Sequence, residues 1–162
     1  VQKDNNLSDK TVRSCLNGYL VQERDNKVET PDTLENKGAR EATPAEIDDM
    51  IFAQIIVKHT KSNAIVLAKN KQLLGSGMGQ TSRVNSLRQA IEKAHHFNLD
   101  LHGAVMGSDA FFPFGDSVEI AHAEGITAVI EPGGSIRDNE TVDFCKAHDM
   151  ALVFSGVRHF KH

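Results

Sequence analysis

The chain has 162 residues, of which 40% are hydrophobic and 25% charged, a composition that allows one packed domain and excludes an intrinsically disordered protein. Its 18 basic and 22 acidic residues give a net charge of −4, which argues against a dedicated nucleic-acid binder because such proteins usually carry a basic surface. No apolar run approaches the roughly 18 residues of a membrane span, and no secretory leader is recognisable. Two isolated cysteines, Cys15 and Cys145, indicate no disulfide framework. We therefore expect a cytoplasmic protein and, because the first residue is Val1, a piece of a longer one.

Residues 1–42 form a polar segment in which one short strand is predicted. Apolar and polar side chains alternate over residues 17–22, as in a strand at the edge of a hairpin. Residues 29–41 have no periodic pattern and are typical of a connector. We place a domain boundary after residue 42, and we expect the segment before it to pack on a neighbouring domain or to be partly loose.

A helix and a β-hairpin are predicted next. Residues 43–46, Thr-Pro-Ala-Glu, form a capping box with proline at the first helical position, and apolar residues then recur at helical spacing over 44–58. Residues 63–68 form a short apolar strand, which Asn70-Lys71 turns back into a second strand at 72–74.

The rest of the chain alternates helices with strands. Thr81 or Ser82 caps one helix, Asp116 caps a second that Gly125 ends, and Asp138 caps a third. The strands that follow these helices are predicted at residues 104–106, 126–130 and 150–154. Such alternation requires parallel strands with helices on their faces, while the leading hairpin adds an antiparallel edge. The predicted fold class is therefore α/β, a three-layer α/β/α sandwich with a mixed, mostly parallel sheet.

Four segments follow strands, at the edge where parallel sheets bind ligands. Residues 75–80 have glycine at every second position without matching a dinucleotide fingerprint, so they form either a tight turn or a close backbone approach to a ligand. Residues 132–137 form a turn or bind an anion through free backbone amides. Residues 108–114, with three phenylalanines, form a buried plug or a wall for a flat aromatic ligand. Residues 157–162 are a solvated tail or a phosphate clamp built on Arg158.

We expect no metal site. His95, His96 and His102 are close in sequence, but neighbouring helical residues point to different faces and nothing supplies a second shell. Residues 122–124 match the H-x-E half of the zinc deaminase signature, but the P-C-x-x-C half is missing. Cys145 stands beside no evident base and is typical of a small core residue.

Five segments, in the order in which they occur, carry a resemblance to a known family. They are residues 61–64 (KSNA), 79–84 (GQTSRV), 108–114 (SDAFFPF), 132–138 (PGGSIRD) and 158–162 (RHFKH). Together they resemble the C-terminal part of the PurH family, bifunctional purine biosynthesis proteins that join a phosphoribosylaminoimidazolecarboxamide formyltransferase to an IMP cyclohydrolase. The resemblance covers essentially residues 17–162. It implies that residues 43–162 are a cytidine-deaminase-like subdomain without zinc, within the formyltransferase domain.

The reaction that this resemblance implies is transfer of a formyl group from 10-formyltetrahydrofolate to the exocyclic amine of 5-aminoimidazole-4-carboxamide ribonucleotide (AICAR). That amine is a weak nucleophile because its lone pair is delocalised, so the step needs a positioned base and a donor to the developing oxyanion. In the family a Lys-His pair fills these roles and lies outside this chain. Lys58-His59 is the same dipeptide, but it stands at the end of a helix. We therefore expect no catalytic residue here and no turnover by the fragment alone.

What the resemblance carries over is binding. The positions similar to nucleotide-binding residues of the family are Asn63, Arg83, Phe111 and Arg158. Those similar to folate-binding residues are Val84, Asp116, Ser135 and Ile136. Gly115 departs from the family, many of whose members carry a bulkier or charged residue there, which leaves the detail of this loop open.

The partners implied are the two substrates, the remaining formyltransferase and cyclohydrolase domains, and a second copy in a homodimer, with neither nucleic acid nor membrane. A monovalent cation near the site is left open. Two alternatives remain at this point. The chain is either a fragment of the enzyme or a non-catalytic binding or dimerisation module on the same scaffold, and a zinc-dependent deaminase is a third interpretation.

Overall fold

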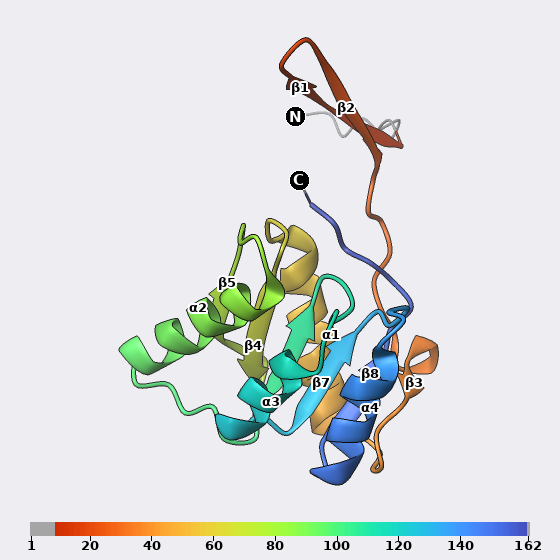
Figure 1. Ribbon diagram of the computed structural model, residues 1–162. Coiled ribbons are helices and arrows are strands. Elements are labelled where there is room, and N and C mark those ends of the chain that lie inside the picture. Colours follow the sequence, from red (N-terminus) through yellow and green to blue (C-terminus); the bar gives the residue numbers. More distant parts are fainter. Residues whose placement is uncertain (1–8, 162) are drawn as a thin grey trace.

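The computed structural model describes residues 9–161, which form a mixed six-stranded sheet with four α-helices and, apart from it, a two-stranded hairpin (Figure 1). The helices are α1 (Pro44–His59), α2 (Arg83–His96), α3 (Asp116–Ala123) and α4 (Asp138–Ala147), with a short 3₁₀ helix at Pro31–Thr33. The hairpin consists of β1 (Lys10–Cys15) and β2 (Gly18–Glu23). The strands of the sheet are β3 (Glu35–Asn36), β4 (Ile65–Lys69), β5 (Gln72–Gly77), β6 (Val105–Ser108), β7 (Ala128–Glu131) and β8 (Ala151–Phe154).

The order of strands in the sheet is β3-β8-β7-β6-β4-β5. The α/β class and the mixed sheet agree with the sequence analysis, but the prediction of a mostly parallel sheet was wrong. Only β6-β7 and β7-β8 are parallel pairs, whereas β3-β8, β4-β6 and β4-β5 are antiparallel. The cause is the route of the chain through α2. It leads from β5 past β4 to β6, so β6 runs parallel to β5 but pairs with β4, which runs the opposite way.

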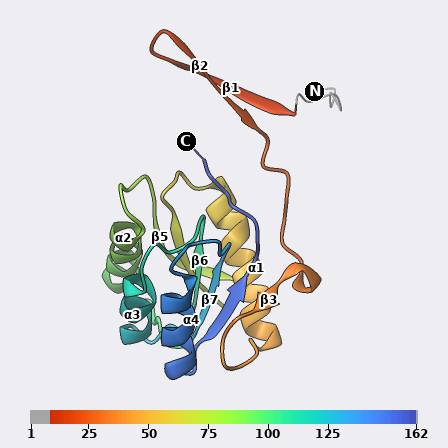
Figure 2. The same cartoon turned by 45° about the vertical axis from the view of Figure 1, so that its right-hand side comes forward.

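Helices cover both faces of the sheet, with α1 on one face and α2, α3 and α4 on the other (Figure 2). Successive residues of β4 supply both cores, because side chains alternate across a strand. Val66 and Ala68 pack with α1, whereas Ile65 and Leu67 pack with the other three helices. The central strands are therefore largely apolar, as expected for strands covered on both sides, and their polar residues Lys69, Ser108 and Glu131 stand at the strand ends. In residues 9–161, no helix combines the length and apolar character needed to cross a membrane.

Helix α1 begins at the predicted capping box, and Arg40 ties its first turn to the preceding residues. The Glu46 N–H donates to Thr43 Oγ1 at 3.2 Å, and the Thr43 N–H donates to Glu46 Oε2 at 2.9 Å. Arg40 Nη1 and Nη2 donate to the two oxygens of the same carboxylate at 2.8 and 2.6 Å. Since β3 pairs with β8, residues of the expected connector contribute a sheet strand as well as this ion pair.

The loop before α4 differs from the prediction. The N-cap residue of α4 is Arg137, and Asp138 is the first residue of the helix rather than its cap. The Asp138 carboxylate instead accepts the backbone N–H groups of Gly134 and Ser135, at 2.7 and 2.8 Å. These two amides of residues 132–137 are thus already satisfied within the protein, which weakens the interpretation of the loop as an anion-binding nest.

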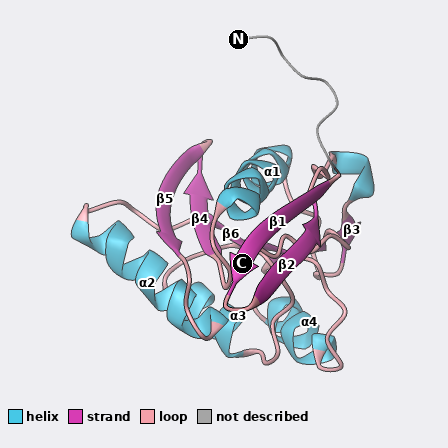
Figure 3. Cartoon of the chain, turned by 90° about the horizontal axis from the view of Figure 1, so that it is seen from above, coloured by secondary structure: helices cyan, strands magenta, loops and turns pink. Residues whose placement is uncertain are grey.

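The hairpin β1-β2 stands beyond the edge of the sheet where β7 and β8 end, and seen from above it crosses that edge (Figures 1 and 3). Strand β2 corresponds to the strand predicted at residues 17–22, and β1 was not predicted. Several apolar side chains of the hairpin are exposed, namely Val12, Leu16, Tyr19, Leu20 and Val21. A two-stranded hairpin is marginally stable on its own.

Alternate glycines let α2 lie directly on β5. A Cβ atom added at Gly77 would stand 1.8 Å from the carbonyl oxygen of Ser86, and one added at Gly75 would stand 2.1 Å from that of Ala90. No side chain fits at such distances, so these positions serve close helix–strand packing. The backbone N–H groups of residues 78 and 79 also bond within the protein. The structure therefore favours the packing and turn interpretation of residues 75–80.

We expect Gly77→Ala to lower the free energy of unfolding by roughly 1–3 kcal/mol, because the added methyl forces α2 away from the sheet. Urea unfolding followed by circular dichroism measures the change. Gly18→Ala is the matched control, since a Cβ at Gly18 meets only the Cys15 carbonyl oxygen, at 4.0 Å. Equal stabilities of the two variants would contradict the packing role of Gly77.

Candidate functional site

All eight predicted binding residues lie at one edge of the sheet, the edge at which β6, β7 and β8 end. Strand β4 begins there too, because it is antiparallel to β6 and Ile65 stands opposite Ser108. The nucleotide-type positions are just before β4 (Asn63), at the start of α2 (Arg83), after β6 (Phe111) and after β8 (Arg158). The folate-type positions are Val84 in α2, Asp116 at the start of α3, and Ser135 and Ile136 in the loop between β7 and α4.

Arg83 forms an ion pair with Asp109 at the centre of this edge. Arg83 Nη2 lies 3.2 Å from Asp109 Oδ1; the Asp109 side chain is fully buried and that of Arg83 nearly so. Asp109 Oδ2 and Arg83 Nε are also buried, and each lacks a hydrogen-bond partner among the described residues. Removing one member of such a pair leaves the other as an unpaired buried charge. Arg83 is thus held rigidly, with part of its charge already used inside the protein.

Arg158 and Phe111 lie together although 47 positions separate them. The Cζ atom of Arg158 lies 5.1 Å from the centre of the Phe111 ring, a cation–π distance. One terminal nitrogen of the guanidinium is 3.3 Å from where a Cβ of Gly134 would stand, so glycine leaves room for it. No carboxylate within residues 9–161 forms an ion pair with Arg158. An exposed cation beside an aromatic ring suits an anionic ligand that also carries a flat ring.

Asn63 is fixed by the turn that precedes α2. Its Nδ2 donates to the Gln80 carbonyl oxygen at 3.0 Å, and its own carbonyl oxygen accepts the Ser86 hydroxyl at 2.7 Å. Within the described range, Asn63 Oδ1 accepts no hydrogen bond, so it is available to a donor group of a ligand.

The folate-type positions form a more open surface. Ile136 is fully exposed and Asp116 is exposed, as the residue that follows the N-cap Gly115 of α3. Ser135 is half-buried and accepts the Arg137 N–H at 3.1 Å. The structure thus places these residues along the same edge as the nucleotide-type positions.

The structure confirms the buried plug for one of the three phenylalanines of residues 108–114, and the wall for a flat ligand stays a prediction. Phe112 is fully buried and acts as the plug, whereas Phe111 is half-buried and Phe114 is exposed. Arg137 lies over the Phe114 ring, with its Cζ atom 4.9 Å from the ring centre. Phe111 and Phe114 therefore lie outside the core, each with an arginine over its ring, and Phe112 anchors the segment.

The C-terminal residues are held on both sides, so the interpretation as a solvated tail is not supported. The Ser62 N–H donates to the Lys161 carbonyl oxygen at 3.0 Å, and the Lys161 N–H donates to the Ser62 hydroxyl oxygen at 3.0 Å. Gln22 Nε2 donates to the Phe160 carbonyl oxygen at 2.6 Å, and the His159 N–H donates to that of Asp109 at 3.0 Å. The backbone on either side of Arg158 is thereby positioned.

Sequence reasoning missed a clamp built on His159. The His159 imidazole is fully buried, with Nδ1 2.5 Å from Asp25 Oδ2 and Nε2 2.7 Å from Glu29 Oε1. Burial by itself lowers the pKa of His159, but the hydrogen bonds and charges of Glu29 and Asp25 outweigh it and raise the pKa. A protonated imidazole can donate to both carboxylates at once. No local pattern signals this contact, because more than 100 residues separate the partners.

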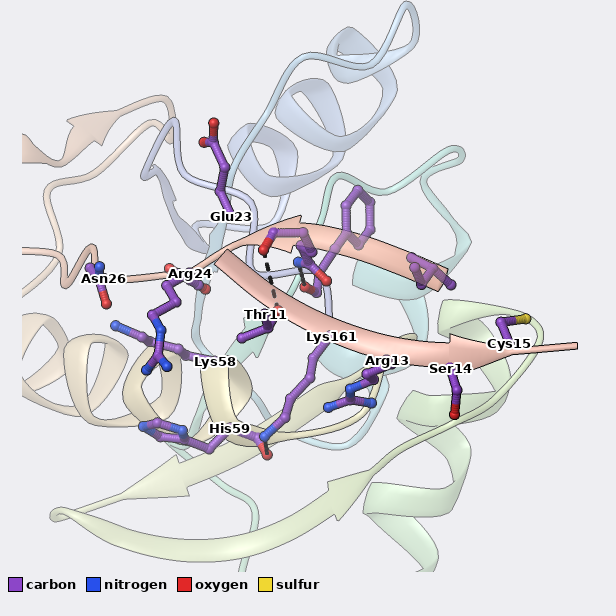
Figure 4. A pocket seen from close by; sticks show the side chains of 14 residues that line it. Thr11, Arg13, Ser14, Cys15, Glu23, Arg24, Asn26, Lys58, His59 and Lys161 are labelled. Carbon is purple, nitrogen blue, oxygen red and sulfur yellow. Dashed lines mark hydrogen bonds between the residues drawn. The ribbon is translucent and has the colours of Figure 1, made fainter. Parts of the chain in front are cut away.

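A cavity of about 590 Å³ lies between the hairpin, the end of α1 and the C-terminal residues (Figure 4). Cationic side chains approach it from all three sides, namely Arg13, Arg24, Lys58 and Lys161. Lys58 and His59, at the end of α1, line this cavity. In the part of the chain that the structure describes, no three His, Cys, Asp or Glu side chains are grouped to hold a metal ion.

We expect His159→Gln to remove a pH-dependent part of the stability. Because the folded pKa of His159 is raised above its ordinary value of about 6.5, the imidazolium stabilises the wild type fully below that pH, and the contribution is lost as the pH rises through the raised pKa. Urea unfolding at a series of pH values should therefore show a wild-type advantage that shrinks with rising pH.

The control variant is His95→Gln, which removes a His–Glu pair of 2.9 Å with Glu124 on the surface. Exposed pairs contribute little, so this variant should follow the wild type at every pH. An advantage over His159→Gln that does not change with pH would contradict the clamp.

Comparison with known proteins places the chain in a family. The sequence model of the AICARFT/IMPCHase bienzyme family matches residues 1–93. The chain is 59% identical over 162 residues to the bifunctional purine biosynthesis protein PurH of Bacteroides thetaiotaomicron, covering 100% of this chain and 32% of that protein. It is 54% identical over 151 residues to the PurH protein of Aquifex aeolicus, covering 93% of this chain and 29% of that one.

The chain thus spans about a third of the length of these relatives. A solved structure from Thermotoga maritima, a diaminohydroxyphosphoribosylaminopyrimidine deaminase/5-amino-6-(5-phosphoribosylamino)uracil reductase, aligns with a TM-score of 0.44 and 17% identity. That alignment covers 67% of this chain and 34% of the other, and the likeness is too slight to support an argument. The sequence matches are sufficient by themselves: the chain belongs to the AICARFT/IMPCHase bienzyme family.

Proposed function

We propose that this chain is the C-terminal part of the formyltransferase of a bifunctional PurH protein and supplies binding residues for both substrates. The reaction is transfer of the formyl group of 10-formyltetrahydrofolate to the exocyclic amine of AICAR, on the route to IMP. Family membership supports a role in purine biosynthesis. The common location of the eight predicted binding residues at one edge of the sheet supports the assignment to the formyltransferase.

The observation that carries the proposal is the pair formed by Arg158 and Phe111. The Arg158 guanidinium lies 5.1 Å from the centre of the Phe111 ring and forms no ion pair among residues 9–161. Its charge is therefore available to a phosphate. AICAR combines a phosphate with a flat heterocycle and a carboxamide. Asn63 Oδ1, which accepts no hydrogen bond in the described chain, can accept one from the carboxamide.

The proposed division of labour leaves the proton transfers to residues outside this chain. Formyl transfer requires a base for the weakly nucleophilic amine and a donor to the developing oxyanion. Lys58 donates to the Lys27 carbonyl oxygen at 2.7 Å, and the carbonyl of His59 accepts from Lys161 Nζ at 3.0 Å. The Lys58 side chain is thus engaged by the segment that follows the hairpin, and we assign the dipeptide no catalytic role.

We further propose that residues 43–162 form a deaminase-like α/β/α subdomain and that the segment before them leads to other parts of a cytoplasmic homodimer. The exposed apolar side chains of β1-β2 support an unoccupied contact surface there. In this proposal 10-formyltetrahydrofolate is a co-substrate, zinc is not needed, and a monovalent cation near the site is left open.

In the full-length protein, we expect Arg158→Ala to raise the KM for AICAR by about tenfold or more, because a charge-assisted contact to phosphate is lost. Steady-state formyltransferase assays at saturating folate measure this change. Arg88→Ala is the control, since Arg88 is exposed on α2 beside a shallow hollow next to α3. An unchanged KM in Arg158→Ala would remove Arg158 from the nucleotide site.

For the 162-residue chain alone, we expect binding of AICAR in a titration calorimeter but no formyl transfer, because no base is assigned within it. Robust turnover by this chain would overturn the proposed division of labour. IMP cyclohydrolase activity without AICAR binding would instead assign the chain to the other activity of the bienzyme.

A further inference from the structure

A buried carboxyl group that the proposed function does not use lies directly behind the Phe111 segment. Glu131 is the last residue of β7, and its side chain is fully buried. Its Oε2 accepts the backbone N–H of Phe112 at 2.8 Å, whereas Oε1 is buried without a hydrogen-bond partner in the described range. Since buried polar groups are normally satisfied, a carboxyl group with one oxygen unpaired calls for a physical account.

The surroundings of Glu131 disfavour the ionised form of its carboxyl group. Burial is the main cause that raises the pKa of Glu131 to about 8, and the nearby Asp138 carboxylate raises it further. The Phe112 N–H and the Arg83 charge act in the opposite direction but are outweighed. Arg83 is engaged by Asp109, and Glu131 takes part in no ion pair within residues 9–161. The raised pKa favours the protonated, neutral form of this carboxyl group at neutral pH.

Cys145 of α4 is a further titratable group close enough to interact with Glu131. Its pKa is raised to about 12, by burial first and by Glu131 second, so the thiol is neutral as well. The hydrogen bond between Glu131 and Phe112 is fully buried, so a lost partner costs more there than it does at the surface.

This hydrogen bond fixes the backbone one residue away from the proposed nucleotide contact. Phe112 is the buried anchor of the segment, and Phe111 precedes it with Arg158 over its ring. We propose that Glu131 is a positioning residue, whose hydrogen bond holds the Phe111–Phe112 backbone and thereby sets the place of the Phe111 ring beneath Arg158. The role in ligand binding rests on the function proposed above. The hydrogen bond to Phe112 and the protonation state of Glu131 do not depend on it.

The first test uses no ligand. In the 162-residue chain labelled with ¹⁵N, the amide resonance of Phe112 should shift with a midpoint near pH 8. The matched variant is Glu131→Gln, whose amide oxygen can still accept the Phe112 N–H but does not titrate. The shift should be absent in that variant. A midpoint near the ordinary pKa of Glu, about 4.3, or no titration in the wild type, would overturn the proposal.

The second test follows Arg158 itself. The side-chain N–H resonance of Arg158 should carry a ring-current shift from Phe111 in the wild type and in Glu131→Gln, and lose it in Glu131→Leu, which leaves the Phe112 N–H unpaired. An unchanged shift in Glu131→Leu would show that Glu131 positions nothing. If Glu131→Leu does not fold, Glu131→Ala takes its place, because it also removes the acceptor of the Phe112 N–H, and an unchanged ring-current shift in that variant would overturn the proposal.

The third test measures AICAR binding by calorimetry. We expect about tenfold weaker binding by Glu131→Leu, the loss typical of an unpaired buried donor, and near wild-type binding by Glu131→Gln. If the wild type binds no AICAR, the proposed function fails, while the two resonance tests still decide the role of Glu131. If the wild type binds and Glu131→Leu binds equally well, only the positioning role fails.

Discussion

Asp109 is the residue on which the arrangement of this edge depends. Its backbone N–H donates to the Ala64 carbonyl oxygen at 3.3 Å, its own carbonyl oxygen accepts the His159 N–H at 3.0 Å, and its carboxylate pairs with Arg83. One buried residue after β6 therefore joins the start of β4, the start of α2 and the C-terminal tail. Asn63, Arg83 and Arg158 are each a member or a direct neighbour of these partners. A buried carboxylate is tolerated only when it is paired, so the whole set has to form together.

The tail is held from the opposite side by residues from the other end of the chain. Asp25 and Glu29 enclose the His159 imidazole, while Gln22 at the base of the hairpin holds the backbone of Phe160. Arg158 thus projects from a strap fixed on the core side and on the N-terminal side. In this arrangement the segment before residue 43 is a structural support of the binding edge as well as a connection.

Much of the fold could be predicted because its signals are local. The capping box of α1 is satisfied within four residues, and Asn70 and Lys71 both adopt positive φ values, 54° and 57°, as a two-residue hairpin turn requires. The order of helices and strands after residue 43 follows from such signals. The direction of β6 relative to its neighbour does not, because it depends on which side of the hairpin the chain returns to after α2. The amides of residues 132–137 looked free in the sequence, but Asp138 occupies two of them.

The sequence by itself determined the α/β class, the sequence of elements and the positions that resemble binding residues, because caps, turns and motifs are written over a few neighbouring residues. Only the tertiary structure decided the pairing of the strands, the burial of Glu131 beside Phe112, and the clamp of His159 between Asp25 and Glu29. The side-chain contacts join residues that are 19 to 134 positions apart in the sequence. The protonation of the buried groups depends on the charges that folding places around them. Their energies arise from desolvation and from the partners that folding brings together, and neither is encoded in a local pattern.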